Sequence, residues 1–178
     1  MLAAADPAGA AGPTPPPCSP ITVTPRLTAP AAGDVYLRAG TAACDTIEIE
    51  VAVHGLQGVF TVAFDLGYPT GVLRYEGYAQ GTLLLHGPPH QAPLFLVREA
   101  SPGSLLVSMT RFAPDPAVSA DGSEGLVRLR FHRVTAGQAD VDFIGGTTSA
   151  IPERIVDGEG AIVTARFAPG HGATLVVP

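Results

Sequence analysis

The sequence contains no lysine, no asparagine and no tryptophan, and charged residues make up only 15% of it. Its ten basic residues are therefore all arginines, and sixteen acidic residues bring the net charge to -6. An acidic surface repels phosphate groups, which excludes a nucleic-acid-binding function. The apolar fraction of 46% is too high for a chain that is disordered throughout. The composition therefore indicates a folded protein that does not bind nucleic acid.

Long apolar runs are also missing, because no stretch of 18 apolar residues occurs anywhere in the chain. A membrane-spanning helix needs about that length, so none is expected. The 21 glycines and 18 prolines both disfavour helices, which argues against a long-helix protein or a coiled coil. A length of 178 residues fits one domain, or one domain with a tail.

Cysteine is scarce, with only Cys18 and Cys44. Neither forms a C-x-x-C or a Cys/His spacing of the kind that binds zinc. Two cysteines fit one disulfide in an exported protein, or two unrelated buried thiols. The segment Met1–Ala11 lacks the basic region and the long apolar core of a signal peptide, so we expect a mature or trimmed N-terminus.

The chain divides near residue 33. Residues 1–33 contain eight of the eighteen prolines and many alanines. Such a segment favours extended polyproline geometry and buries too little surface to fold alone. We therefore predict a linker or tail over residues 1–33 and one folded domain over residues 34–178.

From Asp34 onward the hydrophobic pattern has a period of two. In Ile47–Val53 the apolar side chains alternate with Glu48, Glu50 and Ala52, which is typical of a half-buried strand. Val59–Leu66 places Phe60, Val62, Phe64 and Leu66 on one face, and Leu126–Val134 does the same with Val127, Leu129 and Phe131. Further strands are expected at Val35–Arg38, Val72–Tyr75, Thr82–Leu85, Leu94–Arg98, Ser104–Phe112, Val141–Phe143, Ala161–Phe167 and Ala173–Val177.

Turn signals separate these strands, among them Gly55 with Gly58, Tyr68-Pro69, Pro102-Gly103 and Asp121-Gly122. About ten short strands with turns between them predict an all-β protein, an antiparallel β-sandwich or jelly roll.

Motifs that carry catalysis are absent: the sequence has no G-x-S-x-G, no P-loop, no G-x-G-x-x-G and no H-E-x-x-H. His86 and His90 bracket Gly-Pro-Pro, so they cannot form a helical metal pair. Asp115, Asp121 and Glu124 share one loop but provide too few oxygens for a dedicated calcium site. We therefore expect no catalytic residues, no metal and no cofactor.

The ordered motifs resemble those of the cohesin domain family. The stretch TIEIEVAVHGLQGVFTVAFDLGYPTGVLRYEGYAQGTLL resembles the first half of a cohesin, with an alternating strand, a short glycine turn, an aromatic-rich strand and a Tyr-Pro corner. The second half continues the match at Gly103–Thr110, at Asp121–Phe131 and at Gly160–Val163. The resemblance covers about 145 residues and rests on the order and spacing of these motifs.

The resemblance implies a nine-stranded jelly roll of non-catalytic character. It also implies a dockerin-type protein as the partner, within extracellular assemblies that degrade polysaccharides or attach enzymes to the cell surface. An extracellular location, in turn, favours a Cys18–Cys44 disulfide that ties the tail to the domain.

The same resemblance places the partner-binding positions at Thr61 and Ala63, where many cohesins have Asn and Asp. Ala63 cannot accept a hydrogen bond through its side chain. Asp65 faces the same side and could substitute, and we expect it to be exposed. The family's corner aspartate is also absent, because Tyr68 is followed by Pro69 and Thr70.

Two other functions fit the same fold. One is a structural or adhesive sandwich domain of an exported protein. The other is a carbohydrate-binding module, for which Tyr36, Tyr68, Tyr75 and Tyr78 are the only tyrosines able to stack on a sugar. A concave aromatic strip would favour the carbohydrate-binding alternative.

Overall fold

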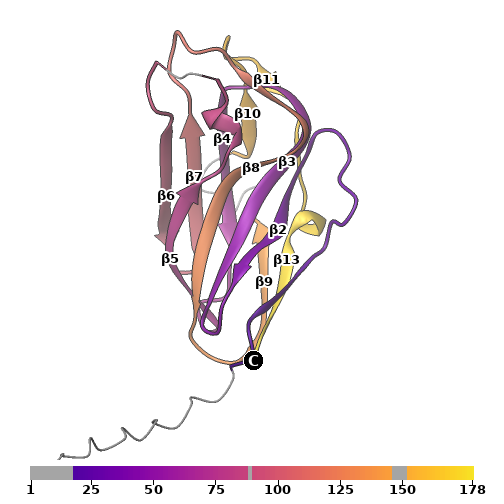
Figure 1. Cartoon of the computed structure of the whole chain (residues 1–178), viewed down its shortest axis with the longest axis vertical. Coiled ribbons are helices and arrows are strands. Elements are labelled where there is room, and N and C mark those ends of the chain that lie inside the picture. The colour runs from indigo at the N-terminus through magenta and orange to yellow at the C-terminus, as the bar shows by residue number, and fades with distance from the viewer. Residues whose placement is uncertain (1–17, 88–89, 146–151) are drawn as a thin grey trace, which may run out of the picture.

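The computed structural model describes residues 18–87, 90–145 and 152–178, which form two β-sheets packed face to face (Figure 1). The five-stranded sheet has the order β12 (Arg166–Phe167), β2 (Asp34–Ala42), β3 (Thr46–Val59), β8 (Val118–Arg133) and β5 (Leu73–Gln80). The eight-stranded sheet runs through β1 (Thr22–Pro25), β13 (Ala173–Val177), β9 (Gly137–Phe143), β4 (Thr61–Gly67), β10 (Arg154–Val156) and β11 (Ile162–Val163).

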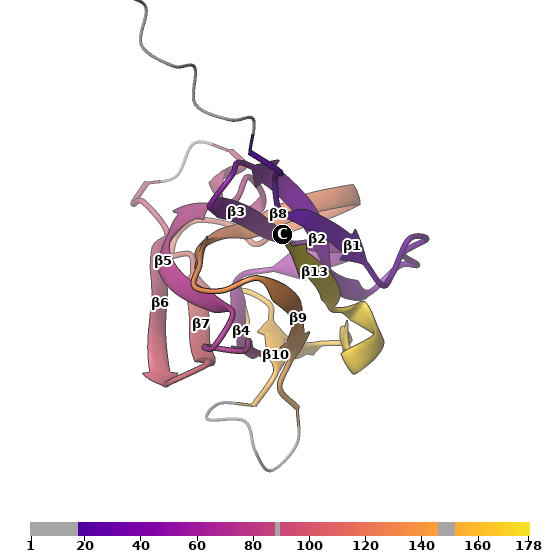
Figure 2. The same cartoon turned by 90° about the horizontal axis from the view of Figure 1, so that it is seen from below.

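The remaining two strands of the larger sheet are β7 (Ser104–Thr110), which pairs with β4, and β6 (Leu94–Ser101), which pairs with β7. All strand pairs are antiparallel except β12 with β2. Seen along the strands, the two sheets enclose one core (Figure 2). The predicted all-β sandwich of jelly-roll type is confirmed. The expected count of nine strands is not confirmed, because the described residues form thirteen strand segments.

The alternation predicted from the sequence places the core correctly in three strands. In β3, β4 and β8 the predicted inward residues are at most 1% exposed: Ile47, Ile49, Val51, Val53, Val62, Phe64, Leu66, Val127, Leu129 and Phe131. Phe64 lies at the centre, where its ring centroid is 5.6 Å from that of Phe143 and 5.9 Å from that of Phe167.

Phe60 is the exception, because it is half-buried rather than buried. It lies between β3 and β4, at the point where the chain crosses from one sheet to the other. Its N–H donates to the Val156 carbonyl at 2.9 Å, and its carbonyl accepts from the Arg111 N–H at 3.0 Å. The alternation that places a side chain inward holds within one strand and breaks at this crossing.

Several turn signals turn out to lie inside strands. Gly55 and Gly58 fall within β3, with φ angles of 57° and 72°, and the pairing of β3 with β8 shifts register beside them. Asp121 and Gly122 lie within β8. These glycines therefore mark β-bulges, which bend a continuous strand instead of ending it.

Three other expectations about strands need correction. Leu83–Leu85 forms a short 3₁₀ turn, η1, in place of the strand expected at Thr82–Leu85. The strand expected at Ala161–Phe167 is two short strands, β11 and β12, which belong to different sheets. The strands β1 and β10 were not predicted, since one contains proline and the other spans three residues.

The segment before residue 33 contributes to the sandwich. β1 pairs with β13, and Ile21 is 1% exposed within the core. Thr22–Pro25 therefore belongs to the larger sheet and not to the tail predicted over residues 1–33. Residues 1–17 lie outside the described residues.

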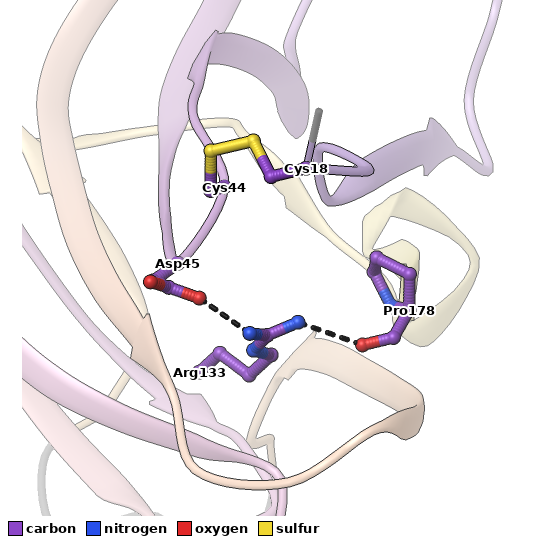
Figure 3. Close-up of a disulfide and its surroundings, with 5 residues drawn as sticks. All are labelled: Cys18, Cys44, Asp45, Arg133 and Pro178. Carbon is purple, nitrogen blue, oxygen red and sulfur yellow. Dashed lines mark hydrogen bonds and ion pairs between the residues drawn. A yellow bond between two sulfur atoms is a disulfide. The ribbon is translucent and has the colours of Figure 1, made fainter. Parts of the chain in front are cut away.

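The predicted disulfide between Cys18 and Cys44 is present, with the two Cα atoms 5.5 Å apart (Figure 3). Cys18 precedes β1 and Cys44 precedes β3, so the bond connects the starts of strands in the two sheets. Nearby, Arg133 donates to the Pro178 carbonyl at 2.8 Å and pairs with Asp45 at 2.6 Å. The disulfide and these Arg133 contacts lie at the same end of the sandwich, where the first and the last described residues come together.

Candidate partner-binding face

The predicted partner-binding residues lie on β4, which runs through the middle of the eight-stranded sheet. Val62, Phe64 and Leu66 point into the core, so Thr61, Ala63 and Asp65 face away from it. One edge of β4 pairs with β7 along its whole length, and the other edge pairs with β10 and then β9. These strands and β6 therefore form one continuous surface, which we call the outer face of the eight-stranded sheet.

The first row of side chains across this face follows the strand register from Leu94 through Thr110, Thr61 and Val156 to Ile162. The two end residues are strongly exposed, at 53% for Leu94 and 76% for Ile162. In the middle, the hydroxyl oxygens of Thr61 and Thr110 are 2.6 Å apart and share a hydrogen bond. The row thus has aliphatic residues at its ends and, at its centre, two threonine hydroxyls that are hydrogen-bonded to each other.

The second row consists of Leu96, Ser108, Ala63 and Arg154. Leu96 is 45% exposed, whereas the small side chain of Ala63 is 6% exposed. Because Ala63 and Ser108 are short, the middle of this row is low, and Leu96 and Arg154 stand at its two ends. The outer face therefore has a shallow floor at Ala63.

The third row runs from Arg98 through Leu106 to Asp65, and here one expectation is wrong. Asp65 is fully buried, not exposed. The Ile144 N–H donates to the backbone carbonyl of Asp65 at 3.0 Å, and Glu153 lies close enough for the Asp65 charge to act on it. Burial, and then the charge of Asp65, raise the pKa of Glu153. Asp65 is thus not available on the surface, while Thr61 is half-buried and Ala63 nearly covered.

The most exposed residues of this face could not be recognised in the sequence. The run Leu94–Val97 is apolar at every position, so alternation could not tell which side chains face outward. Ile162 and Arg154 lie on short strands that pair only in the folded chain. Only the pairing of β6 with β7 and of β10 with β4 reveals that Leu94, Leu96 and Arg154 share a surface with β4.

The histidines and loop carboxylates considered for metal binding form separate pairs. His90 lies 2.5 Å from Asp115, and His86 lies 3.7 Å from Glu124. Hydrogen bonds from the backbone and the ring of His90 lower the pKa of Asp115. Within the part of the chain that the structure describes, no three His, Cys, Asp or Glu side chains are grouped to hold a metal ion.

No helix among the described residues is long and apolar enough to cross a membrane. The only helical pieces described are short 3₁₀ turns such as η1 and η3 (Pro169–His171).

No protein-family model matches the sequence, and no curated protein matches it. Solved structures do match the fold. A non-cellulosomal cohesin from the hyperthermophilic archaeon Archaeoglobus fulgidus is 18% identical, with a TM-score of 0.54, over 76% of this chain and 85% of that one. The sixth cohesin from scaffoldin B of Acetivibrio cellulolyticus, solved in complex with the Cel5 dockerin, is 17% identical, with a TM-score of 0.55, over 75% and 90%.

A third similar structure is the cohesin module of a family 33 glycoside hydrolase from Clostridium perfringens, which is 12% identical, with a TM-score of 0.52, over 88% of this chain and 93% of that one. The identities are low, so the likeness concerns the fold and not the binding residues. The chain therefore has a cohesin-like fold.

Proposed function

We propose that this chain is a non-catalytic interaction module that binds a dockerin-type protein through the outer face of its eight-stranded sheet. The observation that carries the proposal is the set of exposed aliphatic side chains on that face, Leu94, Leu96 and Ile162, around the low floor at Ala63. The cohesin of Acetivibrio cellulolyticus with the same fold was solved with a dockerin bound, which supports this class of partner.

The shape of the face suits a helical partner. A sheet surface with short side chains in its middle lets a helix approach closely, and aliphatic residues at the sides become buried by the contact. Binding energy in such interfaces is concentrated in a few residues near the centre. Leu96 and Ala63 occupy one row near the middle of the strands, so they are the residues on which we expect binding to depend most.

An extracellular setting is part of the same proposal. Disulfides persist in oxidising compartments and are rare in the cytosol of most organisms, and Cys18 and Cys44 are bonded. In that setting the module would attach a dockerin-bearing protein to a polysaccharide-degrading or cell-surface assembly.

The tyrosines give little support to direct polysaccharide binding. Tyr36 and Tyr68 are buried, at 5% and 7% exposed, and Tyr75 packs against Phe131. Tyr78 is 42% exposed, but its hydroxyl donates to the Phe95 carbonyl at 3.0 Å. Stacking on a sugar needs exposed ring faces, and the four tyrosines do not form a shared strip.

Titration calorimetry against the dockerin modules of the source organism tests the proposal. The variant Ala63→Arg raises the floor of the face, and we expect it to weaken binding at least tenfold. Ala79→Arg is the matched control, because Ala79 lies on the outer face of the other sheet, opposite Arg128. Circular dichroism should show that both variants are folded. Loss of binding in both variants, or in neither, would argue against this face, and the absence of binding to every dockerin would overturn the function.

A further inference from the structure

The arginines of this protein divide into those with partners and those without. Most of the ten donate hydrogen bonds or form ion pairs, such as Arg38 with Glu50 at 2.6 Å and Arg166 with Asp34 at 2.7 Å. Among the residues that the structure describes, the side chains of Arg98, Arg128 and Arg154 form neither an ion pair nor a hydrogen bond, and all three residues are exposed. Two of these three, Arg98 and Arg154, lie on the outer face of the eight-stranded sheet.

The two arginines stand on opposite sides of the low floor. Arg98 on β6 lies in the row of Asp65, and Arg154 on β10 lies in the neighbouring row of Ala63. Three strand spacings separate β6 from β10, which is about 14 Å, and the two rows differ by two residues, which is about 7 Å along the strands. The Cα atoms are therefore about 16 Å apart by this geometry, with Ser108 and Ala63 on the two strands between them and Leu96 beside Arg98 on β6.

The acidic residues of this face are already engaged or covered. Asp142 and Asp140 pair with Arg26 at 2.6 Å and 3.2 Å, and Asp65 is buried. Glu153, beside Asp65, is half-buried, and burial raises its pKa. The free charges that the face offers to a partner are therefore positive, although the whole chain carries a net charge of -6. A guanidinium group presents a fork of N–H donors that matches a carboxylate, so it recognises Asp and Glu side chains.

We propose that the partner presents carboxylates to this face: a helix whose Asp or Glu side chains, two to three turns apart, bind Arg98 and Arg154 while its apolar side chains pack on Leu96 and Ala63. A helix rises 1.5 Å per residue, so positions i and i+11 lie about 16 Å apart on one side of the helix, and the reach of the arginine side chains also admits i and i+7. The inference rests on the proposed function, because it specifies the partner of the same face.

Charge-reversing variants test this inference with a dockerin module that binds the wild-type chain. Arg98→Glu and Arg154→Glu should each weaken binding at least tenfold, and the double variant more, since each places a carboxylate against a carboxylate. Arg128→Glu is the matched control, because Arg128 is equally exposed and unpaired but lies on the five-stranded sheet, opposite Glu50. Its affinity should stay within twofold of the wild type.

Two further measurements separate charge recognition from a loss of structure. The wild-type affinity should fall as the salt concentration rises, because exposed charge pairs are screened. A dockerin whose facing Asp and Glu residues are changed to Lys should bind the double variant better than it binds the wild type.

The outcomes distinguish a failure of the acidic-partner inference from a failure of the proposed dockerin-binding function. If Ala63→Arg abolishes binding while Arg98→Glu and Arg154→Glu bind normally, the proposed function stands and the acidic partner is overturned. If the reversals weaken binding and the lysine-bearing dockerin restores it, the inference is confirmed. If no dockerin binds the wild type, both the proposed function and the acidic-partner inference are overturned.

Discussion

The outer faces of the two sheets differ in how their charges are paired. On the five-stranded sheet, Arg38 donates to Glu50 at 2.6 Å, and Glu76 lies 3.5 Å from Arg130 and 3.4 Å from Arg74. On the eight-stranded sheet, Leu94, Leu96 and Ile162 are between 45% and 76% exposed. The first face largely satisfies its own polar groups, whereas the second exposes aliphatic surface that water solvates poorly.

The contrast between the two faces indicates where a partner should bind. Cross-strand ion pairs keep a sheet face soluble without contributing much stability, because exposed pairs are worth little. Exposed aliphatic side chains gain free energy when another surface covers them.

Removing the ring of Phe64 should have the largest effect on stability. The side chain is fully buried and contacts the rings of Phe143 and Phe167, so Phe64→Ala should lower the free energy of unfolding by about 3–5 kcal/mol. Leu96→Ala, on the opposite side of the same sheet, should change it by less than about 0.5 kcal/mol. Urea unfolding of both variants measures the contrast. Equal losses would mean that Leu96 supports the fold and does not await a partner.

Reducing the disulfide should have the next largest effect on stability, because the bond connects the segments that precede β1 in one sheet and β3 in the other. The bond closes a loop with a sequence separation of 26, and its loss should cost about 3–4 kcal/mol in the chain-entropy model. Denaturant unfolding with and without reductant measures the loss, and intact mass should rise by two hydrogens on reduction. A Cys18→Ser/Cys44→Ser variant is the control, since reductant should leave it unchanged. Two free thiols in protein from an oxidising compartment would contradict the bond.

The pH dependence of stability should report on two carboxyl groups with shifted pKa values, Glu153 beside Asp65 and Asp34 at the start of β2. Burial and the charge of Asp65 raise the pKa of Glu153, so the folded chain holds its proton more tightly than the unfolded chain does. This contribution to stability is complete below the ordinary pKa of 4.5 and is lost as the pH rises through the raised value.

Glu153→Gln should therefore be more stable than the wild type at pH 7, and the difference should shrink towards pH 4. Urea unfolding across this range measures the difference in stability.

Asp34 should show the opposite pH dependence of stability. Although burial opposes its charge, hydrogen bonds from the Ala31 N–H and Arg166 lower its pKa. Its contribution is present above the ordinary value of 3.8 and lost as the pH falls, so Asp34→Asn should destabilise the chain at pH 7.

The smallest effect is expected for the ion pair between Arg38 and Glu50 on the five-stranded sheet. A double-mutant cycle with Arg38→Met and Glu50→Gln should give a coupling free energy of about 0.2–1 kcal/mol, because both groups keep contact with water. The same variants should leave dockerin affinity unchanged. A change in affinity would show that the five-stranded sheet also takes part in binding.

The sequence predicted the core better than the surface. Alternation in β3, β4 and β8 correctly placed Val51, Phe64 and Leu129 inside, since that rule needs only neighbours two residues away. It failed at Phe60, where the chain changes sheets. The glycines at 55 and 58 were misread as turns because a bulge and a turn use the same residues.

The binding face was only partly predictable. Alternation placed Thr61, Ala63 and Asp65 on the side away from the core, but it could not show that Asp65 is fully buried there. The role of these three residues in binding stays a prediction. The charge pattern of the face was not visible in the sequence, because Arg98 and Arg154 look like any other exposed arginines there.

The alternation of apolar and polar residues was enough to predict the all-β fold class and most inward-facing residues of the main strands, because a period of two is a local property of each strand. Which outward residues remain exposed, and which charges remain unpaired, could be learned only from the folded chain. Both depend on strand neighbours that are distant in the sequence: β10 and β7 flank β4, and β6 lies beyond β7. Register between such strands is set by the packing of the whole sandwich, so Arg98, Leu96 and Arg154 come to share one surface only in the folded chain.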